Sequence, residues 1–163
     1  MNFLENYNKM KKNILFIGGS TGIGFETIKL IHNEHNVFVA SRSDESFSDL
    51  NITHIKYDIL SDDFNNELVP EKLHGFVYCP GSINLRPFRS IKSTTFEEDL
   101  NINFISMVKT LQKVINNLKK SENSSIVLYS TVAVKVGMPF HTSVSASKGA
   151  IEGFARSLAA EYA

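Results

Sequence analysis

The sequence predicts an α/β domain in which a parallel β-sheet carries helices on both faces. Three observations support this fold class. Short apolar runs alternate with longer segments whose apolar residues recur at helical spacing, as expected for βαβ units. The first apolar run, 14–17, leads into a glycine-rich turn at 18–24 and then into an amphipathic segment. The chain has 163 residues, enough for one domain with a substantial core and too few for two.

The composition is that of an ordinary globular domain, with 42% hydrophobic and 21% charged residues. Seventeen Lys and Arg residues balance 17 Asp and Glu residues, so no net charge favours nucleic acid or an anionic membrane as a partner. Cys79 is the single cysteine, which excludes an internal disulfide and fits a reducing compartment. The sequence has no apolar run of 18 residues and no signal-peptide core. We therefore expect a soluble, cytoplasmic protein.

The elements of the first half follow from where the apolar runs begin and end. Residues 1–12 are polar and are expected to form an N-terminal leader, followed by a single domain at 13–163. Segment 43–51 is short and polar, so no full helix is expected there. The elements predicted for this half are a strand at 13–18, a helix at 22–34 with Phe25, Ile28, Leu30 and Ile31 facing inward, strands at 37–40 and 52–57, a short helix at 61–68, and a strand at 73–79.

The second half is predicted to hold a long helix at 95–119, a strand at 126–130 and an Ala- and Ser-rich helix at 143–163. A threonine at 94 or 95, with a glutamate three residues later, predicts a capping box at the start of the long helix. Right-handed βαβ connections then give the strand order 3-2-1-4-5. The predicted fold is thus a Rossmann-type, doubly wound parallel sheet of about five strands.

Gly18, Gly22 and Gly24 follow the first strand with the spacing G-x-x-x-G-x-G. Gly18 lets the backbone turn sharply off the strand, Gly22 leaves room for a pyrophosphate, and Gly24 lets the helix pack close to the sheet. Unpaired N–H groups and the positive end of the helix dipole then face an anion. The turn therefore indicates a dinucleotide-binding loop. A tight β–α turn without a ligand is the alternative.

Several motifs in chain order resemble those of the short-chain dehydrogenase/reductase family. They are the glycine turn, Asp58, Asn103, a serine at the end of the fifth strand, and the run Ser145-Ala-Ser-Lys148. The resemblance covers nearly the whole chain from the first strand but only the first part of a typical member, whose fold would add two strands and a substrate-covering segment. The chain ends inside a helical pattern. We expect either a truncated chain or a helix that ends only because the sequence does.

The resemblance implies a nicotinamide dinucleotide as cofactor. The implied cofactor-binding residues are Gly18, Ser20, Thr21, Gly22, Ile23, Gly24, Ser41, Arg42, Asp58, Ile59, Gly81 and Lys148. Asp58 matches the acid that hydrogen-bonds the adenine amino group, although a strand-end Asp that caps the next turn is the alternative. At the end of the second strand, Arg42 offers a planar fork of donors to a 2′-phosphate, which favours NADP over NAD unless Arg42 is simply a solvated loop residue.

The resemblance also implies the catalytic positions. Asn103 matches the helix asparagine that holds a water in the family's proton relay, with Asn101 as a register alternative. Counting back from Lys148 places the catalytic-serine position on Thr131, with Ser130 immediately before it. A threonine hydroxyl donates the same hydrogen bond to a carbonyl.

The sequence departs from the family at two places. Residues 78–81 read Tyr-Cys-Pro-Gly where the family has Asn-Asn-Ala-Gly, so only Gly81 is kept. Val144 stands where the family has the tyrosine of Tyr-x-x-x-Lys, and valine cannot move a proton. His141, one helical turn earlier, is a candidate substitute because of its intrinsic pKa, and an exposed loop histidine is the alternative. Lys148 is still expected to bind the nicotinamide ribose.

Two functions remain open from the sequence. The first is an NAD(P)-dependent oxidoreductase that transfers a hydride to or from a carbonyl or alcohol. The second is a nucleotide-binding pseudo-enzyme, or a regulatory or assembly protein, without redox turnover. The other four histidines are dispersed, so no metal site is expected, and Cys79 is interpreted as a small core residue. By resemblance we expect a homo-oligomer formed through the helices at 95–119 and 143–163.

Overall fold

The computed structural model describes residues 10–162, so most of the expected leader and Ala163 lie outside the described residues. It contains one five-stranded sheet with the order β3-β2-β1-β4-β5, which confirms the predicted topology. Every pair of neighbouring strands is parallel. The strands are β1 (Asn13–Ile17), β2 (Asn36–Ser41), β3 (Ile52–Lys56), β4 (Gly75–Tyr78) and β5 (Ser125–Leu128).

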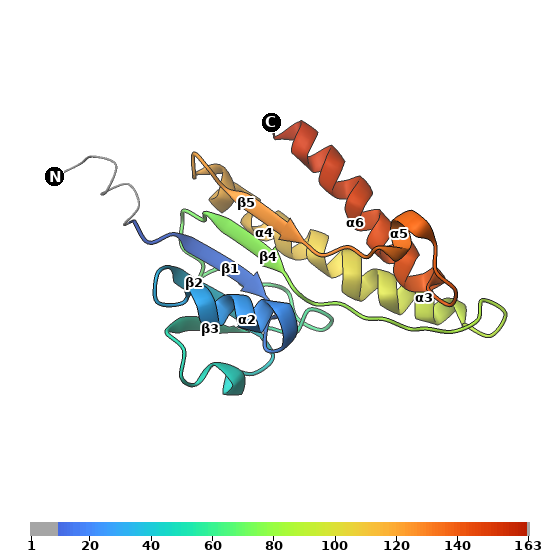
Figure 1. Cartoon of the computed structure of the whole chain (residues 1–163). Coiled ribbons are helices and arrows are strands. Elements are labelled where there is room, and N and C mark those ends of the chain that lie inside the picture. Colours follow the sequence, from blue (N-terminus) through green and yellow to red (C-terminus); the bar gives the residue numbers. More distant parts are fainter. Residues whose placement is uncertain (1–9, 163) are drawn as a thin grey trace.

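Helices cover both faces of the sheet, as Figure 1 shows. One face is covered by α2 (Gly22–Ile31), and the 3-10 turn η1 (Glu45–Phe47) adds Phe47 to the same core. The other face is covered by the π-helical segment η2 (Asn101–Ile105), α4 (Ser106–Lys119) and α6 (Thr142–Glu161), and α3 (Ser93–Leu100) packs against α6. The short helix α5 (Ala133–Val136) joins β5 to α6. None of the helices within residues 10–162 is long and apolar enough to cross a membrane.

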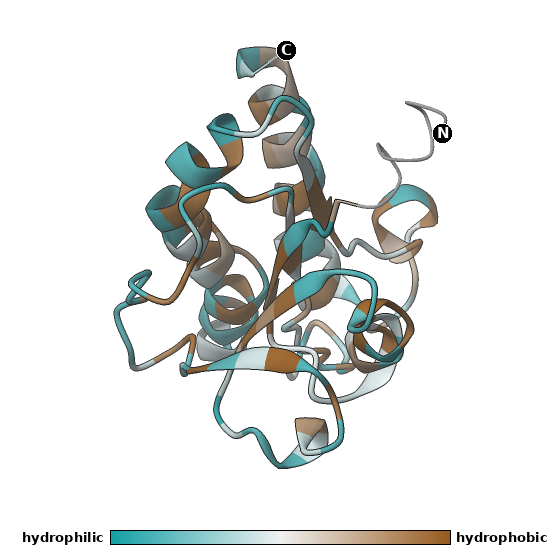
Figure 2. Cartoon of the chain, turned by 90° about the vertical axis from the view of Figure 1, so that its left-hand side faces the viewer, coloured by the Kyte–Doolittle hydropathy of each residue, from teal (hydrophilic) through white to brown (hydrophobic). Residues whose placement is uncertain are grey.

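The two cores follow from the alternation of side chains along the strands. In β1, Leu15 and Ile17 point into the core beneath α4, whereas Phe16 points into the core beneath α2. From the helices, Leu111 and Ile28 close the two cores, and both are almost fully buried. Because both faces are covered at the centre of the sheet, β1 and β4 are apolar on both sides, and much of the strand ribbon at the centre of Figure 2 is brown.

The elements α3, η2 and α4 form one helical run from 93 to 119, interrupted by a π-helical segment at 101–105. The predicted capping box is wrong: the helix begins at Ser93, Lys92 occupies the N-cap, and no side chain caps it. The sequence also predicted a regular helix throughout. A π-helical turn inserts an extra residue per turn and frequently occurs at functional sites.

Three further predictions are wrong. The helix expected at 61–68 is absent, because short polar side chains bind the backbone there: Asp58 Oδ1 accepts a hydrogen bond from Leu60 N at 3.0 Å, and Asn65 Oδ1 accepts one from Glu67 N at 3.0 Å. Such bonds compete with helical ones. Leu30, predicted to face inward, is 78% exposed, and α2 ends at Ile31 rather than near residue 34.

Candidate functional site

A cleft of about 430 Å³ opens at the carboxyl ends of β1, β2, β3 and β4. Most of the predicted cofactor-binding residues line it: Gly18, Ser20, Thr21, Ser41, Arg42, Asp58, Ile59 and Gly81. Gly22, Ile23, Gly24 and Lys148 do not line this cleft. In parallel α/β sheets, ligands bind in the crevice outside these strand ends.

The glycine turn has the backbone geometry of an anion cradle. Gly18, Gly19 and Gly22 have φ angles of 72°, 94° and 64°, in the left-handed region that favours glycine. A Cβ atom at Gly22 would meet nothing within 4 Å, so the start of α2 is open. Thr21 is the N-cap of α2 without a side-chain hydrogen bond, and the first turn has no acidic residue. The N–H groups of this turn are therefore available to a negatively charged group.

Gly24 fixes the distance between α2 and the sheet. A Cβ atom at this position would lie 2.6 Å from Cys79 Sγ and 2.9 Å from Gly19 Cα, so no larger residue fits. This is the close packing that the sequence predicted. Ile23, in the same turn, is 69% exposed, so it offers the site only its backbone.

Burial raises the pKa of the Cys79 thiol to about 12. The thiolate is the reactive form, so we expect Cys79 to react with a disulfide reagent at pH 8 at least about a hundredfold more slowly than a free thiol of ordinary pKa. The release of chromophore from such a reagent measures the rate. The same chain in denaturant is the control and should react at the ordinary rate. A native rate within about tenfold of the denatured one would contradict this prediction.

Three predicted residues form the wall opposite the glycine turn. Ser41 is buried, and its hydroxyl donates to Ser43 O at 2.8 Å, so its side chain is already occupied within the protein. Arg42 is exposed and takes part in none of the ion pairs between described residues. Asp58 caps the turn to Leu60, which is the alternative left open by the sequence, and it also lines the cleft.

Asn103 and Lys148 meet at Gly81. A Cβ atom at Gly81 would lie 3.2 Å from Asn103 Oδ1 and 3.5 Å from Lys148 Nζ, so both side chains lie close to this glycine. Asn103 is fully buried in the π-helical segment. Lys148 is half-buried, and burial lowers the pKa of its ammonium group. The structure therefore brings together two of the predicted catalytic residues beside the cleft.

The other predicted catalytic residues have partners of their own. Ser130 Oγ donates to Glu152 Oε1 at 2.6 Å, and Thr131 Oγ1 accepts from Ala133 N at 3.3 Å. His141 Nδ1 lies 2.7 Å from Pro139 O. Because a carbonyl only accepts, a hydrogen bond between them requires a proton on Nδ1. No hydrogen bond joins these three residues to Asn103 or Lys148 within the described part of the chain.

The sequence missed a buried polar network next to Asn103. Asp99 is fully buried, and Ser143 and Ser147 are 1% exposed. Ser147 Oγ accepts directly from Asn103 Nδ2, whereas Ser143 donates to Asp99, and Asp99 is linked to Asn103 through Ser82, which follows Gly81 in the chain. Ser147 stands in the run 145–148 noted in the sequence, but no pattern marked Asp99 and Ser143, because an isolated serine and a helical aspartate usually face solvent.

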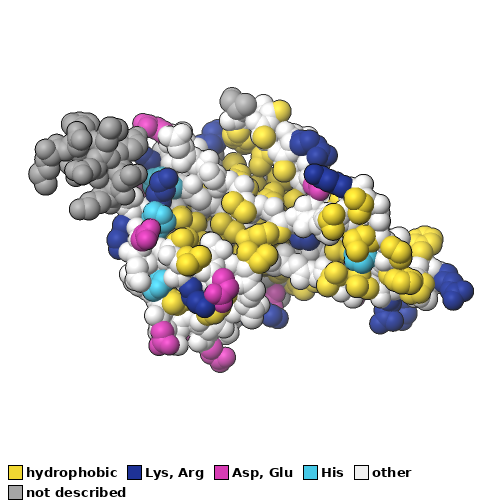
Figure 3. Space-filling model, in the orientation of Figure 1, with side chains coloured by type: hydrophobic (Ala, Val, Ile, Leu, Met, Phe, Trp, Pro, Cys, Tyr) yellow, Lys and Arg dark blue, Asp and Glu magenta, His cyan; other side chains and the backbone are white. Residues whose placement is uncertain are grey.

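Hydrophobic side chains gather at one end of the molecule, over the loop that follows β4 and over α5, on the right in Figure 3. The exposed residues there are Ile83, Leu85, Phe88, Val132, Val136, Met138 and Phe140. Arg86 N donates to Phe140 O at 3.2 Å, which joins the two loops. Phe140 has a φ of 67°, a strained conformation for a non-glycine residue.

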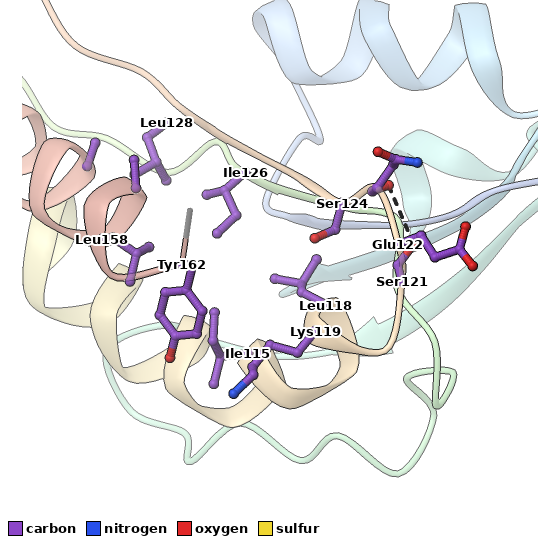
Figure 4. Close-up of a pocket in the computed structure, with 13 residues that line it drawn as sticks. Ile115, Leu118, Lys119, Ser121, Glu122, Ser124, Ile126, Leu128, Leu158 and Tyr162 are labelled. Atoms are coloured by element: carbon purple, nitrogen blue, oxygen red, sulfur yellow. Dashed lines mark hydrogen bonds between the residues drawn. The ribbon is translucent and has the colours of Figure 1, made fainter.

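A second, larger hollow of about 690 Å³ lies away from the predicted site residues, between α4, the turn at 121–124, β5 and α6 (Figure 4). Ile115, Leu118, Ile126, Leu128 and Leu158 point into it, and Tyr162 borders it. The Lys119 ammonium lies 5.4 Å from the centre of the Tyr162 ring. Its lining is apolar along α4, β5 and α6 and polar at the turn 121–124, and it contains none of the residues expected to carry chemistry.

Comparison with known proteins gives a consistent result. Residues 12–163 match the family described as short chain dehydrogenase. A 2,5-dichloro-2,5-cyclohexadiene-1,4-diol dehydrogenase of Sphingobium indicum is 26% identical over 93% of this chain and 66% of its own length. A dehydrogenase/reductase SDR family protein 7-like of Dictyostelium discoideum is 32% identical over 90% of this chain and 54% of its own length. The chain thus spans two thirds or less of these relatives.

Among solved structures, ElxO with NADP bound superimposes with a TM-score of 0.82 at 24% identity, over 94% of this chain and 68% of ElxO. A second structure, of a short chain dehydrogenase/reductase family protein, gives a TM-score of 0.85 at 20% identity, over 94% of this chain and 69% of that protein. At this level of identity the likeness concerns the fold. The sheet order and the flanking helices are those of these proteins.

Proposed function

This chain belongs to the short chain dehydrogenase family, and on that premise we propose that it binds a nicotinamide dinucleotide and acts as an oxidoreductase. One observation carries the proposal: the left-handed glycine turn leads into the uncapped N-terminus of α2 at the edge of the cleft. When bound, the nicotinamide would donate a hydride to a carbonyl carbon or accept one from an alcohol carbon. The relatives described above are a dehydrogenase and a dehydrogenase/reductase, which supports the same class.

Different residues of the cleft would bind different parts of the cofactor. The backbone N–H groups of Gly22 and its neighbours would bind the pyrophosphate, because the first turn of α2 has no other partner. Asp58, which lines the opposite wall, would accept from the adenine amino group with the part of its carboxylate not used by Leu60. Ser20 and Thr21 flank the same turn. These groups bind and orient the cofactor and do not react.

Arg42 supports NADP as the preferred form. It lines the cleft at the end of β2 and forms no ion pair with the described residues, so its guanidinium is free to bind a 2′-phosphate. We expect NADPH to bind more tightly than NADH, and Arg42→Gln to weaken NADPH about tenfold while NADH changes less than about twofold. Titration of nicotinamide fluorescence measures both affinities.

Arg89→Gln is the matched control for this prediction, because Arg89 is an exposed arginine that does not line the cleft. Its affinities for both cofactors should equal those of the unmodified chain. Equal affinities of the unmodified chain for NADPH and NADH would refute the assignment of Arg42. No binding of either at millimolar concentration would refute the oxidoreductase function.

Three groups would take part in the chemistry at the nicotinamide end of the cofactor: the Lys148 ammonium, the Thr131 hydroxyl and a proton donor. The Lys148 ammonium would donate hydrogen bonds to the ribose hydroxyls, and the Thr131 hydroxyl would polarise the substrate carbonyl. Val144 is 4% exposed and has no proton to transfer, so the proton must come from elsewhere. The candidates are water and His141, whose half-buried ring is protonated on Nδ1 when it donates to Pro139 O. Only the imidazolium form of His141 would carry a proton on Nε2 as well.

Val144 is also the observation that favours a second function, nucleotide binding without redox turnover. Both functions share the cofactor site, so cofactor binding does not separate them. Turnover of a carbonyl or alcohol by the chain would establish the first.

For the substrate, the exposed apolar side chains near α5 support a compound with an apolar body.

A further inference from the structure

Four buried hydroxyl groups connect the ends of β3 and β4 to the helical run 93–119, and the proposed reaction uses none of them. They belong to Tyr57, Tyr78, Ser106 and Thr110, each at most 4% exposed. A buried hydroxyl group is costly unless it forms a hydrogen bond, and each of these four has a partner. These bonds therefore show which segments the network holds in place.

Ser106 connects the network to the wall of the cleft. Its hydroxyl donates to Ile59 O at 2.9 Å, because a carbonyl oxygen only accepts. Ser106 is the first residue of α4, directly after the π-helical segment, and its backbone N–H donates to Asn101 O, five residues back. Ile59 follows Asp58 in the loop after β3, and both residues line the cleft. Ser106 thus contacts this wall from the side of the core.

A second connection joins α4 to the residue before Asp58. The Thr110 hydroxyl donates to Ser106 O at 2.8 Å, so its oxygen is left to accept from the Tyr57 hydroxyl, 3.0 Å away. The sheet also holds Tyr57, because its backbone N–H donates to Ser41 O at 3.0 Å. The place of Tyr57 therefore does not depend on its side-chain bond alone.

Ser106 and Asp58 bind opposite sides of one peptide group. This group joins Ile59 to Leu60: its carbonyl oxygen accepts from Ser106, and its N–H donates to Asp58 Oδ1 at 3.0 Å. In a planar trans peptide the C=O and the N–H point in opposite directions. The direction of the bond from Ser106 therefore determines where this N–H points and where it holds the Asp58 carboxylate.

The other restraints on this loop do not replace the bond from Ser106. Asp58 N donates to Asp62 Oδ2 at 2.6 Å and Asp62 N to Asp58 O at 3.0 Å, but these bonds are local and join the loop to no helix. The Ile59 side chain packs in the core beneath α4, and apolar packing is non-directional. Between residues 10 and 162, Ser106 is the one residue of the helical run that forms a hydrogen bond with loop 58–60.

We propose that Ser106 is a positioning residue for the adenine end of the cofactor: it orients the Ile59–Leu60 peptide, whose N–H holds Asp58 Oδ1 and leaves Oδ2 for the ligand. The assignment of Oδ2 to the adenine amino group rests on the proposed function, whereas the orientation of the peptide does not. Without the hydroxyl, Ile59 O would have no donor at a partly buried position. The peptide would then turn toward water, and the Asp58 carboxylate would follow its N–H.

A matched pair of variants tests the proposal. Ser106→Ala and Thr110→Val each remove one hydroxyl of the network, but only Ser106 contacts the Ile59–Leu60 peptide. The readout is the ratio of the affinities for NADPH and for its hypoxanthine analogue, in which a carbonyl oxygen replaces the adenine amino group. This oxygen cannot donate to Asp58, so the unmodified chain should bind NADPH about tenfold more tightly. Ser106→Ala should reduce this ratio to about twofold, and Thr110→Val should leave it near tenfold.

The ratio separates positioning from stability. Both variants lose a buried hydrogen bond and should unfold at a lower denaturant concentration, but a less stable fold weakens both cofactors alike and leaves their ratio unchanged. A ratio in Ser106→Ala equal to that of the unmodified chain would overturn the proposal, and so would equal losses in the two variants. An unmodified chain that binds both cofactors equally would refute the assignment of Asp58 and the proposal with it.

Hydrogen exchange of the Leu60 amide tests the orientation without a cofactor. Leu60 is exposed, so the bond of its N–H to Asp58 Oδ1 is what slows its exchange. The exchange rate, measured by NMR, should rise about tenfold in Ser106→Ala and change less than about twofold in Thr110→Val. An unchanged rate in Ser106→Ala would overturn the orientation. An unmodified chain that binds neither cofactor would refute the proposed function, and the Leu60 rates would still decide on the role of Ser106.

Discussion

Replacing Gly24 by valine is expected to lower the free energy of unfolding by about 3 kcal/mol, because the new side chain has no space to occupy. Its Cβ would lie 2.6 Å from Cys79 Sγ and 2.9 Å from Gly19 Cα, and the second of these atoms belongs to the glycine turn. Relief of the overlap requires α2 to move away from β4 or the turn to change shape. Chemical denaturation, followed by the helical signal, measures the loss. NADPH affinity should fall with it.

Gly153→Ala is the control for this prediction. Gly153 lies inside α6, and a Cβ atom there would meet nothing within 4 Å. Alanine at that position should raise stability by about 0.5–1 kcal/mol, since glycine is a poor helix former. Adding Cys79→Ala to Gly24→Val should restore only part of the loss, because the contact with the Gly19 backbone remains. Full recovery would show that the glycine turn itself tolerates a side chain.

Tyr78→Ala is expected to cost about 3–5 kcal/mol, the range for deleting a buried aromatic ring. Tyr78 ends β4, is 2% exposed, and packs in the core beneath α4. Its hydroxyl donates to Ile102 O in the π-helical segment at 2.8 Å. Tyr78→Phe keeps the ring and removes only this bond, so it should cost about 1–3 kcal/mol. Denaturation of both variants measures the two contributions separately.

The same residue predicts a pH dependence. Burial raises the pKa of the Tyr78 hydroxyl above its ordinary value near 10, so the folded protein keeps a proton that the unfolded chain releases. The free energy of unfolding should therefore be unaffected by Tyr78 below about pH 10 and should fall as the pH rises beyond it. Tyr78→Phe should lose less stability than the wild type between about pH 10 and 11. A steeper loss in the variant would contradict this.

Local patterns in the sequence predict the fold well because the central strands β1 and β4 lie between covered faces. Apolar runs such as 14–17 and 37–40, which alternate with helical segments along the chain, predicted parallel strands, and right-handed βαβ connections gave the order of the sheet. Element ends were less predictable, because they depend on single hydrogen bonds. The absent helix at 61–68 illustrates this, since Asp58 and Asn65 bind backbone groups that a helix would have used.

The part of the site that is formed by backbone geometry could be predicted from the sequence. The part that is formed by tertiary contacts was harder to predict. Glycines that must adopt left-handed angles are visible in a sequence, and Gly18 and Gly22 do so. The meeting of Asn103 and Lys148 at Gly81 depends on a π-helical turn that no periodicity reveals. The burial of Asp99 was likewise invisible, because its partners lie 15 or more residues away in the chain.

The hollow beside β5 affects how the protein behaves at high concentration. Within the described residues, β5 is an edge strand of the sheet, and the apolar hollow of Figure 4 lies next to it. An edge strand beside an apolar surface is a template on which a further strand can add. With a sequence pI near 7.0, copies of the chain approach one another at neutral pH with almost no electrostatic repulsion. Copies of the chain therefore stay dispersed best in a buffer whose pH is far enough from 7 to give every molecule a net charge of the same sign.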